Sequence, residues 1–163
     1  MTNSIDKRAF RDGLGCFVTG ITIVTTVDEA GEHVGITVNS FNSVSLDPPM
    51  VLFSLDRSAL SLSAFSAAGR FAINVLSNSQ EPLSNRFAQR SADKWSDTSY
   101  RTGETGCRLI DGAMAQFQCE TYAQYDGGDH VIFVGRVVAM AIDTDANPLV
   151  FYKGGYNGLS DVA

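Results

Sequence analysis

The chain has 163 residues, of which 44% are hydrophobic, so it can form one domain with a substantial core but is too short for two ordinary ones. Its net charge is -6 and its basic residues do not cluster, which argues against nucleic-acid or anionic membrane partners. The N-terminal sequence is polar and no apolar run approaches the ~20 residues that span a bilayer. We therefore expect a soluble, cytoplasmic protein with one domain over residues 1–163.

The chain contains three cysteines and two histidines, without the spacing of a metal or disulfide motif. Cys16, Cys107 and Cys119 are far apart, so we expect free thiols instead of a disulfide framework or a CxxC site. With only His33 and His130 available, a metal site would need assembly from distant parts of the chain. We expect no bound metal ion.

The first elements are a short helix and a hairpin. Apolar residues one helical turn apart predict a helix that starts near Ser4, as a possible N-cap, and stops at Gly13 and Gly15. An almost unbroken β-branched run over 21–27 and alternation over 34–38, separated by turn residues, predict a β-hairpin.

The middle of the chain alternates between strand and helix signals. The continuous apolar run over 50–55 predicts a strand that is buried on both faces. A segment rich in Ala and Leu predicts a helix that opens at Ser58 and closes at Gly69. Leu83 and Phe87 stand four apart, the spacing of one helix face.

The second half of the chain is dominated by strand signals. Residues 91–112 have no clear period and are expected to form a long surface loop. Alternation over 113–125 predicts a strand with one wet face, and 130–142 its hairpin partner, with a bulge or close approach at Gly135. A short last strand falls within 148–155. Strands joined by tight turns favour an antiparallel barrel or sandwich.

One polar stretch, GITVNSFNSVSLDPP, begins as a strand and then fills with hydroxyl and amide side chains. Such groups beside an apolar strand suit the edge of a polar heterocycle or a phosphate. Alternatively, they are only turns and caps, which are common roles for Ser and Asn. The side chains concerned are those of Thr37, Asn39, Ser40, Ser43 and Ser45.

A second polar group follows the apolar strand. Ser58 and Ser61 stand at the expected start of a helix, where free N–H groups and the helix dipole favour an anion, and Arg57 adds a positive charge. Helix capping alone explains these serines equally well.

The sequence YDGGDH has two interpretations. Asp-Gly and Gly-Gly pairs are preferred in tight hairpin turns, so the segment can be purely structural. Alternatively, His130 follows glycines that let a ligand approach the backbone closely, and its imidazole then faces a cleft. Other catalytic motifs are missing from the sequence: GLGCFVTG lacks the third glycine of a dinucleotide fingerprint, and no P-loop, GxSxG or HExxH is present.

Six separated blocks resemble the short-chain flavin reductase family, the reductase partners of two-component flavin monooxygenases. The blocks are FVTGITIVTT, GITVNSFNSVSLDPPMVLFSL, GRFAINVLSNSQ, RFA, YDGGDHVIFVGRV and PLVFYKGGY. They run in order from about Phe10 to Leu159, and the GDH block is a hallmark of the group. The resemblance implies a mainly β chain with a few short helices, folded as a Greek-key split β-barrel that binds FMN or FAD. It also implies a homodimer with the flavin near the subunit interface.

The resemblance assigns roles to individual residues. The implied flavin contacts are Thr37, Val38, Asn39, Ser40, Phe41, Ser43, Val44 and Ser45 around the ring, Arg57, Ser58 and Ser61 at the phosphate, and Arg86 and Phe87 along the rest of the flavin. The implied NAD(P)H contacts are Gly128, Asp129, His130, Tyr152, Lys153, Gly154 and Gly155, with His130 as the catalytic residue.

The implied activity is hydride transfer from NADH or NADPH to the flavin, which then leaves for a partner monooxygenase. Flavin carries this reactivity in its own ring, so the protein has to hold the ring and leave one face open. The alternative is a split-barrel protein that binds or carries flavin without reducing it. A third interpretation is an interaction domain that keeps the barrel only as a scaffold. The choices between FMN and FAD, and between NADH and NADPH, stay open.

Overall fold

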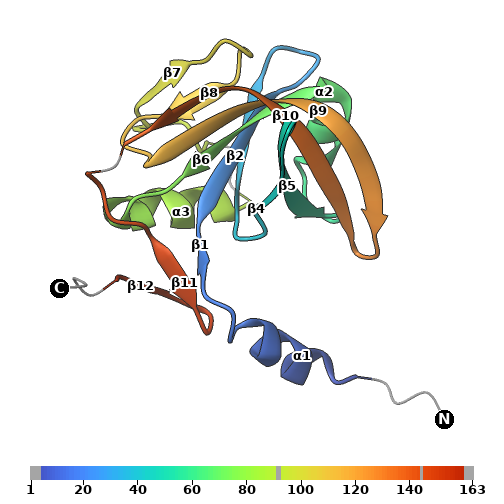
Figure 1. Ribbon diagram of the computed structural model, residues 1–163, viewed down its shortest axis with the longest axis vertical. Coiled ribbons are helices and arrows are strands. Elements are labelled where there is room, and N and C mark those ends of the chain that lie inside the picture. Colours follow the sequence, from blue (N-terminus) through green and yellow to red (C-terminus); the bar gives the residue numbers. More distant parts are fainter. Residues whose placement is uncertain (1–4, 91–92, 144, 160–163) are drawn as a thin grey trace.

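A computed structural model describes residues 5–90, 93–143 and 145–159, and the two predictions that involve Ser4 and Ser91 fall in part outside these ranges. Strands predominate, with a few short helices, as the sequence predicts (Figure 1). In chain order the elements are α1 (Lys7–Leu14), β1 (Thr19–Gly20), β2 (Thr22–Val27), β3 (His33–Val38), β4 (Asn42–Leu46), β5 (Pro49–Asp56), α2 (Leu62–Ala68), β6 (Arg70–Val75), the 3-10 helix η1 (Asn78–Gln80), α3 (Glu81–Ala88), β7 (Tyr100–Thr102), β8 (Arg108–Ile110), β9 (Ala115–Gly127), β10 (His130–Ile142), β11 (Val150–Tyr152) and β12 (Gly155–Asn157).

The main sheet has the strand order β3-β2-β6-β9-β10-β5-β4, and each of these neighbouring pairs is antiparallel. Strands β9 and β10 are the long members, with 13 residues each, and they curve over the rest of the sheet (Figure 1). The predicted antiparallel arrangement is therefore confirmed. Strands β3 and β4 stand at the two ends of the order, so the pairing among the described strands does not form a continuous ring.

Aromatic rings from four elements fill the centre of the curved sheet. Phe53 of β5 stacks on Phe133 of β10, with ring centroids 5.0 Å apart, and meets Phe71 of β6 edge-on at the same distance. Phe65 of α2 closes this cluster from outside the sheet, and all four side chains are fully buried. The aromatic cluster fixes β5, β6 and β10 relative to one another.

Strand β5 is buried on only one face, which corrects the prediction of two buried faces. Val51, Phe53 and Leu55 are buried, whereas Leu52 and Ser54 between them are half-buried. A continuous apolar run indicates that both faces of a strand carry apolar side chains. It does not indicate whether each face is covered by residues of the same chain.

The expected surface loop over 91–112 contains a packed hairpin, so that prediction is wrong for its described part. Strands β7 and β8 pair antiparallel, and Cys107, Leu109 and Ile110 are buried. The Arg108 guanidinium lies 4.5 Å from the Trp95 ring centroid and 3.9 Å from that of Tyr100. Such stacking holds a segment in place without leaving a periodic pattern in the sequence.

The same hairpin explains why the predicted wet face of β9 is wrong over its first half. Gln116 and Gln118 are buried, because the β7–β8 segment covers them. Gln116 donates from Nε2 to the Ile110 carbonyl at 2.6 Å, and Gln118 Oε1 accepts from the Thr105 N–H at 3.1 Å. A sequence pattern does not distinguish a buried Gln whose hydrogen bonds are satisfied from an exposed Gln.

The helix ends are partly as predicted. Asp6 is the N-cap of α1, accepting from the Ala9 N–H at 2.8 Å. The helix runs through Gly13, which is therefore not a stop, and ends at Leu14 with Gly15 as its C-cap. Helix α2 begins at Leu62 and not at Ser58, because Ser58 belongs to the turn after β5. Gly69 ends α2 with φ of 67°, a left-handed conformation that glycine adopts easily, which confirms the predicted stop.

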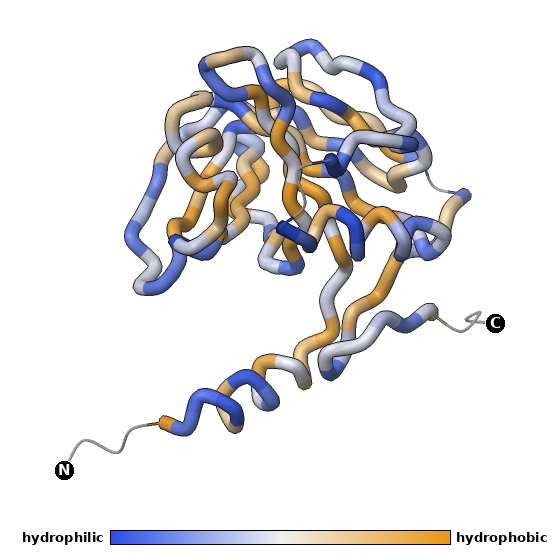
Figure 2. Tube along the Cα trace, turned by 180° about the vertical axis from the view of Figure 1, so that it is seen from behind, coloured by the Kyte–Doolittle hydropathy of each residue, from blue (hydrophilic) through white to orange (hydrophobic). Residues whose placement is uncertain are grey.

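Helix α1 and the β11–β12 hairpin form an arm outside the main sheet (Figure 1). The Lys153 N–H donates to the Gly15 carbonyl at 3.0 Å, and β1 pairs with β11, which ties the arm together. No residue of α1 is buried, and the apolar side chains of Phe10 and Leu14 are exposed. Figure 2 shows that the helix projecting from the body carries both hydrophobic and hydrophilic positions.

Gly135 interrupts β10 at a close approach between strands. The register of β10 against β9 shifts between Val134 and Gly135, which confirms the predicted bulge. A Cβ atom at Gly135 would lie 2.3 Å from Phe71 Cζ and 2.8 Å from Cys119 Cβ. Only glycine fits without displacing the aromatic cluster.

We predict that Gly135→Ala lowers the free energy of unfolding by about 1–3 kcal/mol, the usual cost of overpacking a core. Urea denaturation measures the change. Gly158→Ala, at an exposed position just after β12, is the control, because a Cβ there has no heavy atom within 4 Å. If Gly135→Ala unfolds at the wild-type midpoint, the core tolerates the methyl group and the packing argument fails.

Candidate functional site

A cleft of about 450 Å³ lies between β3, the turn after β5, the start of α2 and the segment that follows α3. Ser58 and Ser61 line one side, and Arg90, Lys94 and Trp95 line the other. The structure therefore brings two of the predicted phosphate residues to one concave site. The lining contains two basic side chains, Arg90 and Lys94, and two acidic ones, Asp28 and Asp56.

The Ser61 hydroxyl is a buried group without a partner among the described residues. Ser61 is the N-cap residue of α2, yet its side chain makes no capping hydrogen bond. Ser58 contributes differently, because its N–H donates to Asp56 Oδ1 at 2.6 Å. Hydrogen bonds from Ser58 lower the pKa of the Asp56 carboxyl. Since buried polar groups are nearly always paired, the Ser61 hydroxyl is a candidate ligand contact.

Two cations stand beside these serines. Lys94 Nζ donates to the carbonyl oxygens of Gly35 and Phe87, at 3.2 and 2.8 Å. Burial lowers the pKa of Lys94, because its acceptors are neutral and do not offset desolvation of the ammonium. Arg90 Nη2 donates to the Ser58 carbonyl at 3.3 Å. An anion in the cleft would satisfy both cations, which makes the cleft chemically suited to a phosphate group.

His33 adds a neutral imidazole to the same cleft. Its Nδ1 is buried and has no hydrogen-bond partner among the described residues. Burial, followed by the charge of Arg108, lowers the pKa of His33. The Trp95 indole N–H donates to the His33 carbonyl at 2.8 Å, which joins this residue to the opposite wall.

The structure gives Arg86 and Phe87 supporting positions and does not place them in the cleft. Phe87 is fully buried and meets the Trp95 ring edge-on, with centroids 5.0 Å apart. A Cβ at Gly35 would lie 2.6 Å from the Phe87 ring, so this packing requires glycine there. Arg86 donates to the Ser96 carbonyl and, at 3.1 Å, to Thr98 Oγ1. Both residues support the cleft wall from behind, and their predicted flavin contact stays a prediction.

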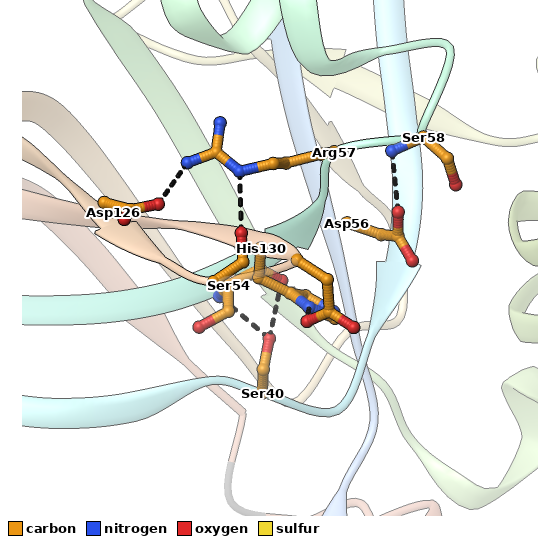
Figure 3. Close-up of polar contacts among 9 residues, drawn as sticks. Ser40, Ser54, Asp56, Arg57, Ser58, Asp126 and His130 are labelled. Atoms are coloured by element: carbon orange, nitrogen blue, oxygen red, sulfur yellow. Dashed lines mark hydrogen bonds and ion pairs between the residues drawn. The ribbon is translucent and has the colours of Figure 1, made fainter. Parts of the chain in front are cut away.

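Three residues of the predicted ring-binding stretch use their side chains within the fold. Thr37 Oγ1 donates to the Ser84 carbonyl at 2.7 Å. Ser40 Oγ both donates to the Ser54 carbonyl and accepts from the Ser54 N–H, each at 2.9 Å (Figure 3). Phe41 stacks on Phe117, with ring centroids 5.7 Å apart.

The remaining residues of that stretch are more open to a ligand. Asn39, Ser43 and Val44 are exposed, and Val38 and Ser45 are half-buried. Strand β4 was not predicted. The register of β4 against β5 shifts between Ser43 and Ser45, which leaves Val44 unpaired at the edge of the sheet. This edge continues from the cleft wall, because β3 contributes to the cleft and ends at Val38.

His130 stands at the corner where β10 begins. It lies opposite Asp56 of β5 and Gly127 of β9 in the strand register. Its Nδ1 is 2.7 Å from Asp129 Oδ1, and 41% of its side chain is exposed. Because the carboxylate accepts from Nδ1–H, the neutral tautomer leaves Nε2 as an outward acceptor. Asp56, which also lines the cleft, connects this corner to it.

Arg57 points toward the turn that precedes His130 and is not part of the cleft lining (Figure 3). Its Nε donates to the Gly128 carbonyl at 2.8 Å, and its Nη2 forms an ion pair with Asp126. Its backbone N–H donates to the Asp129 carbonyl at 2.9 Å. Arg57 and Ser58 are neighbours in sequence, but the Arg57 side chain points away from the cleft that Ser58 lines.

The predicted YKGG contacts form the β11–β12 turn of the arm. Lys153 and Gly154 have φ of 49° and 78°, and Lys153 Nζ lies 5.2 Å from the Tyr152 ring centroid. Figure 1 shows this hairpin well apart from the tip of the β9–β10 hairpin. One chain therefore does not bring Tyr152 to Gly155 next to His130.

Sequence reasoning missed Arg90, Lys94, Trp95 and His33. Arg90, Lys94 and Trp95 follow α3 in a region without periodicity, and their only signal was a cluster of two basic residues and the single tryptophan. Among residues 5–90, 93–143 and 145–159 there is no group of three potential metal ligands. Within those ranges no helix is long and apolar enough to cross a membrane.

Comparison with known proteins identifies the family. The flavin reductase like domain matches residues 14–160, and the chain belongs to this family. A probable flavin reductase of Rhizobium meliloti is 44% identical over 151 residues, which cover 93% of this chain but 48% of that protein, so the chain spans about half of its length. The reductase subunit HsaB of a flavin-dependent monooxygenase from Mycobacterium tuberculosis is 39% identical over 161 residues, 98% of this chain and 86% of that subunit.

A solved structure agrees with this assignment. The NADH:FAD oxidoreductase SgcE6 of Streptomyces globisporus, in complex with NAD and FAD fragments, superimposes with a TM-score of 0.92 at 34% identity. The match covers 99% of both chains. The agreement extends over the arm as well as the main sheet.

Proposed function

We propose that this protein is an NAD(P)H-dependent flavin reductase that supplies reduced flavin to a separate flavin-dependent monooxygenase. The observation that carries the proposal is one cleft lined both by Ser61, whose hydroxyl has no partner among the described residues, and by the half-buried Lys94. Membership of the flavin reductase like family supports the reaction, and the name of the Mycobacterium relative supports the monooxygenase partner.

The residues of the cleft fit a phosphate-bearing flavin, FMN or FAD. Lys94 and Arg90 provide charge, and Ser58 and Ser61 provide hydroxyl groups for phosphate oxygens. The ring then lies along the β3–β4 edge, where Asn39, Ser43 and Ser45 can donate to its polar atoms and Val38 and Val44 can cover its apolar part. In this proposal the β3–β4 edge is supported by the contacts that three residues make within the fold, namely Thr37, Ser40 and Phe41.

When bound, the flavin supplies the acceptor for the hydride of NADH or NADPH. The side chains of the protein contribute by positioning the nicotinamide. His130 Nε2 can accept a hydrogen bond from the nicotinamide carboxamide, while Asp129 holds the imidazole through Nδ1. Gly128, whose φ of 77° favours glycine, places no side chain at the turn before His130. No side chain has to transfer a proton in this step, so His130 acts through geometry.

We also propose that residues 1–163 form one split β-barrel domain. The support is the curvature of the seven-stranded sheet around one aromatic cluster. The β3–β4 connection supports it further, because Ser40 in this connection bonds to Ser54 of β5 and draws the two ends of the strand order together.

We further propose a homodimer. Helix α1 has eight residues and none is buried, whereas isolated helices shorter than ~12–15 residues are marginal in water. Its exposed Phe10 and Leu14, with 58% and 60% of their surface accessible, therefore require a covering surface. A second copy also accounts for the separation of the YKGG turn from His130, because the two can meet across subunits.

The first prediction of this proposal concerns His130. Anaerobic mixing with NADH and FMN should bleach the flavin absorbance, and His130→Ala should lower kcat/KM for NADH by roughly 10- to 100-fold. Flavin affinity should stay within a few-fold, because the imidazole positions the nicotinamide. Fluorescence titration measures the affinity. A wild-type protein that binds flavin without bleaching it is a carrier, and loss of flavin binding in the variant places His130 in the flavin site.

The second prediction distinguishes binding of the flavin phosphate from binding of the flavin ring. Arg90→Gln should weaken FMN binding about tenfold, ~1.4 kcal/mol, and leave riboflavin binding within twofold, since riboflavin lacks the phosphate. Fluorescence quenching measures both affinities. Arg70→Gln, which removes an exposed arginine at the start of β6, is the matched control. Equal losses for the two ligands would place the phosphate elsewhere.

The third prediction concerns assembly. Sedimentation at micromolar concentration should give a dimer, and Phe10→Asp should shift it toward monomer because a carboxylate would be buried at the interface. Asp12→Ser, a polar change on the same exposed helix, should leave the dimer intact. A wild-type monomer that still binds flavin would contradict this proposal.

A further inference from the structure

We infer that Arg57 is a positioning residue for the turn that carries His130, and that it does not bind the flavin phosphate. The inference rests on the proposed function only in assigning His130 to NAD(P)H. The relevant observation is that the side chain and the backbone N–H of Arg57 together contact three residues of an exposed hairpin tip. These residues are Asp126, Gly128 and Asp129.

The first contact extends the sheet. Asp56, the last residue of β5, lies opposite His130 in the register with β10. The next N–H along the chain, that of Arg57, donates to the Asp129 carbonyl at 2.9 Å. The backbone of β5 therefore reaches one residue beyond the start of β10 and into the turn itself.

The side chain then crosses the turn. Arg57 Nε donates to the Gly128 carbonyl at 2.8 Å, and Nη2 forms the ion pair with Asp126 on the β9 side (Figure 3). The guanidinium is a rigid planar fork, so two contacts in different directions fix its orientation and that of the groups it binds. Arg57 thus joins β5 to the end of β9 and to the turn that precedes His130.

The hairpin tip needs such an external support. It is a two-residue turn, in which Gly127 pairs with His130 and Gly128 has φ of 77°, and residues 124–129 are exposed. Segments with few buried contacts open locally at low free-energy cost. Among the described residues the His130 imidazole has a hydrogen-bond partner only in Asp129, at 2.7 Å, and Asp129 is itself part of the tip. Movement of the tip would therefore move the imidazole.

The contacts of Arg57 also argue against a phosphate role. Two of its donor nitrogens are engaged at the turn, and the side chain is absent from the cleft lining, which includes its neighbour Ser58. Arg90 and Lys94 supply the positive charge there instead.

The experiment compares Arg57→Gln, Asp126→Ala and the double variant, with Arg70→Gln as the control arginine. We expect Arg57→Gln to raise KM for NADH about tenfold, while the affinities for FMN and riboflavin stay within twofold. Asp126→Ala should also raise KM. The double variant should be no worse than Arg57→Gln, because both side chains act through the same turn. A loss of FMN affinity with unchanged riboflavin affinity, or additive losses in KM, would overturn the inference.

A second measurement does not depend on activity. The chain has two histidines, so their ring signals are readily assigned by NMR. Arg57→Gln should shift the His130 ring signals at constant pH and leave those of His33 unchanged, and Arg70→Gln should shift neither. Unchanged His130 signals would overturn the inference. If the wild-type protein does not oxidise NADH, the proposed function has failed, and the NMR comparison alone decides the role of Arg57.

Discussion

Strand β10 hydrogen-bonds to β5 along one edge and to β9 along the other, and the candidate site depends on this double pairing. It sets Asp56 opposite His130 and brings the turn between β9 and β10 within reach of Arg57. It also requires Gly135, because the aromatic cluster occupies the space that a side chain would need. A shift in the β10 register would therefore disturb the core and the His130 corner together.

The cleft shows how an acidic protein can present a local site for an anion. The net charge of -6 acts at long range and is screened by salt, whereas Lys94 and Arg90 act over a few ångströms. The acceptors of Lys94 among the described residues are backbone carbonyls, which carry no formal charge to balance the ammonium. Desolvation of that ammonium is a cost that a bound phosphate would offset.

Local signals in the sequence predicted much of the sheet but less of the site. The β-branched residues of β2 and the glycine at the end of α2, Gly69, report on backbone conformation, which neighbours in sequence largely determine. The burial of Gln118 and the position of Trp95 depend on a hairpin that folds back over β9, and no periodic pattern encodes such a contact. The direction of the Arg57 side chain likewise depends on Asp126, 69 residues later in the chain.

Trp95 is an intrinsic fluorescent probe of the cleft. It is the single tryptophan of the chain, it lines the cleft, and its indole contacts Phe87, Arg108 and the His33 carbonyl. Its emission therefore responds to the polarity and packing of one wall and is not averaged over several sites. A planar ligand that enters the cleft, or a local opening of the segment after α3, would change this emission before the aromatic core is disturbed.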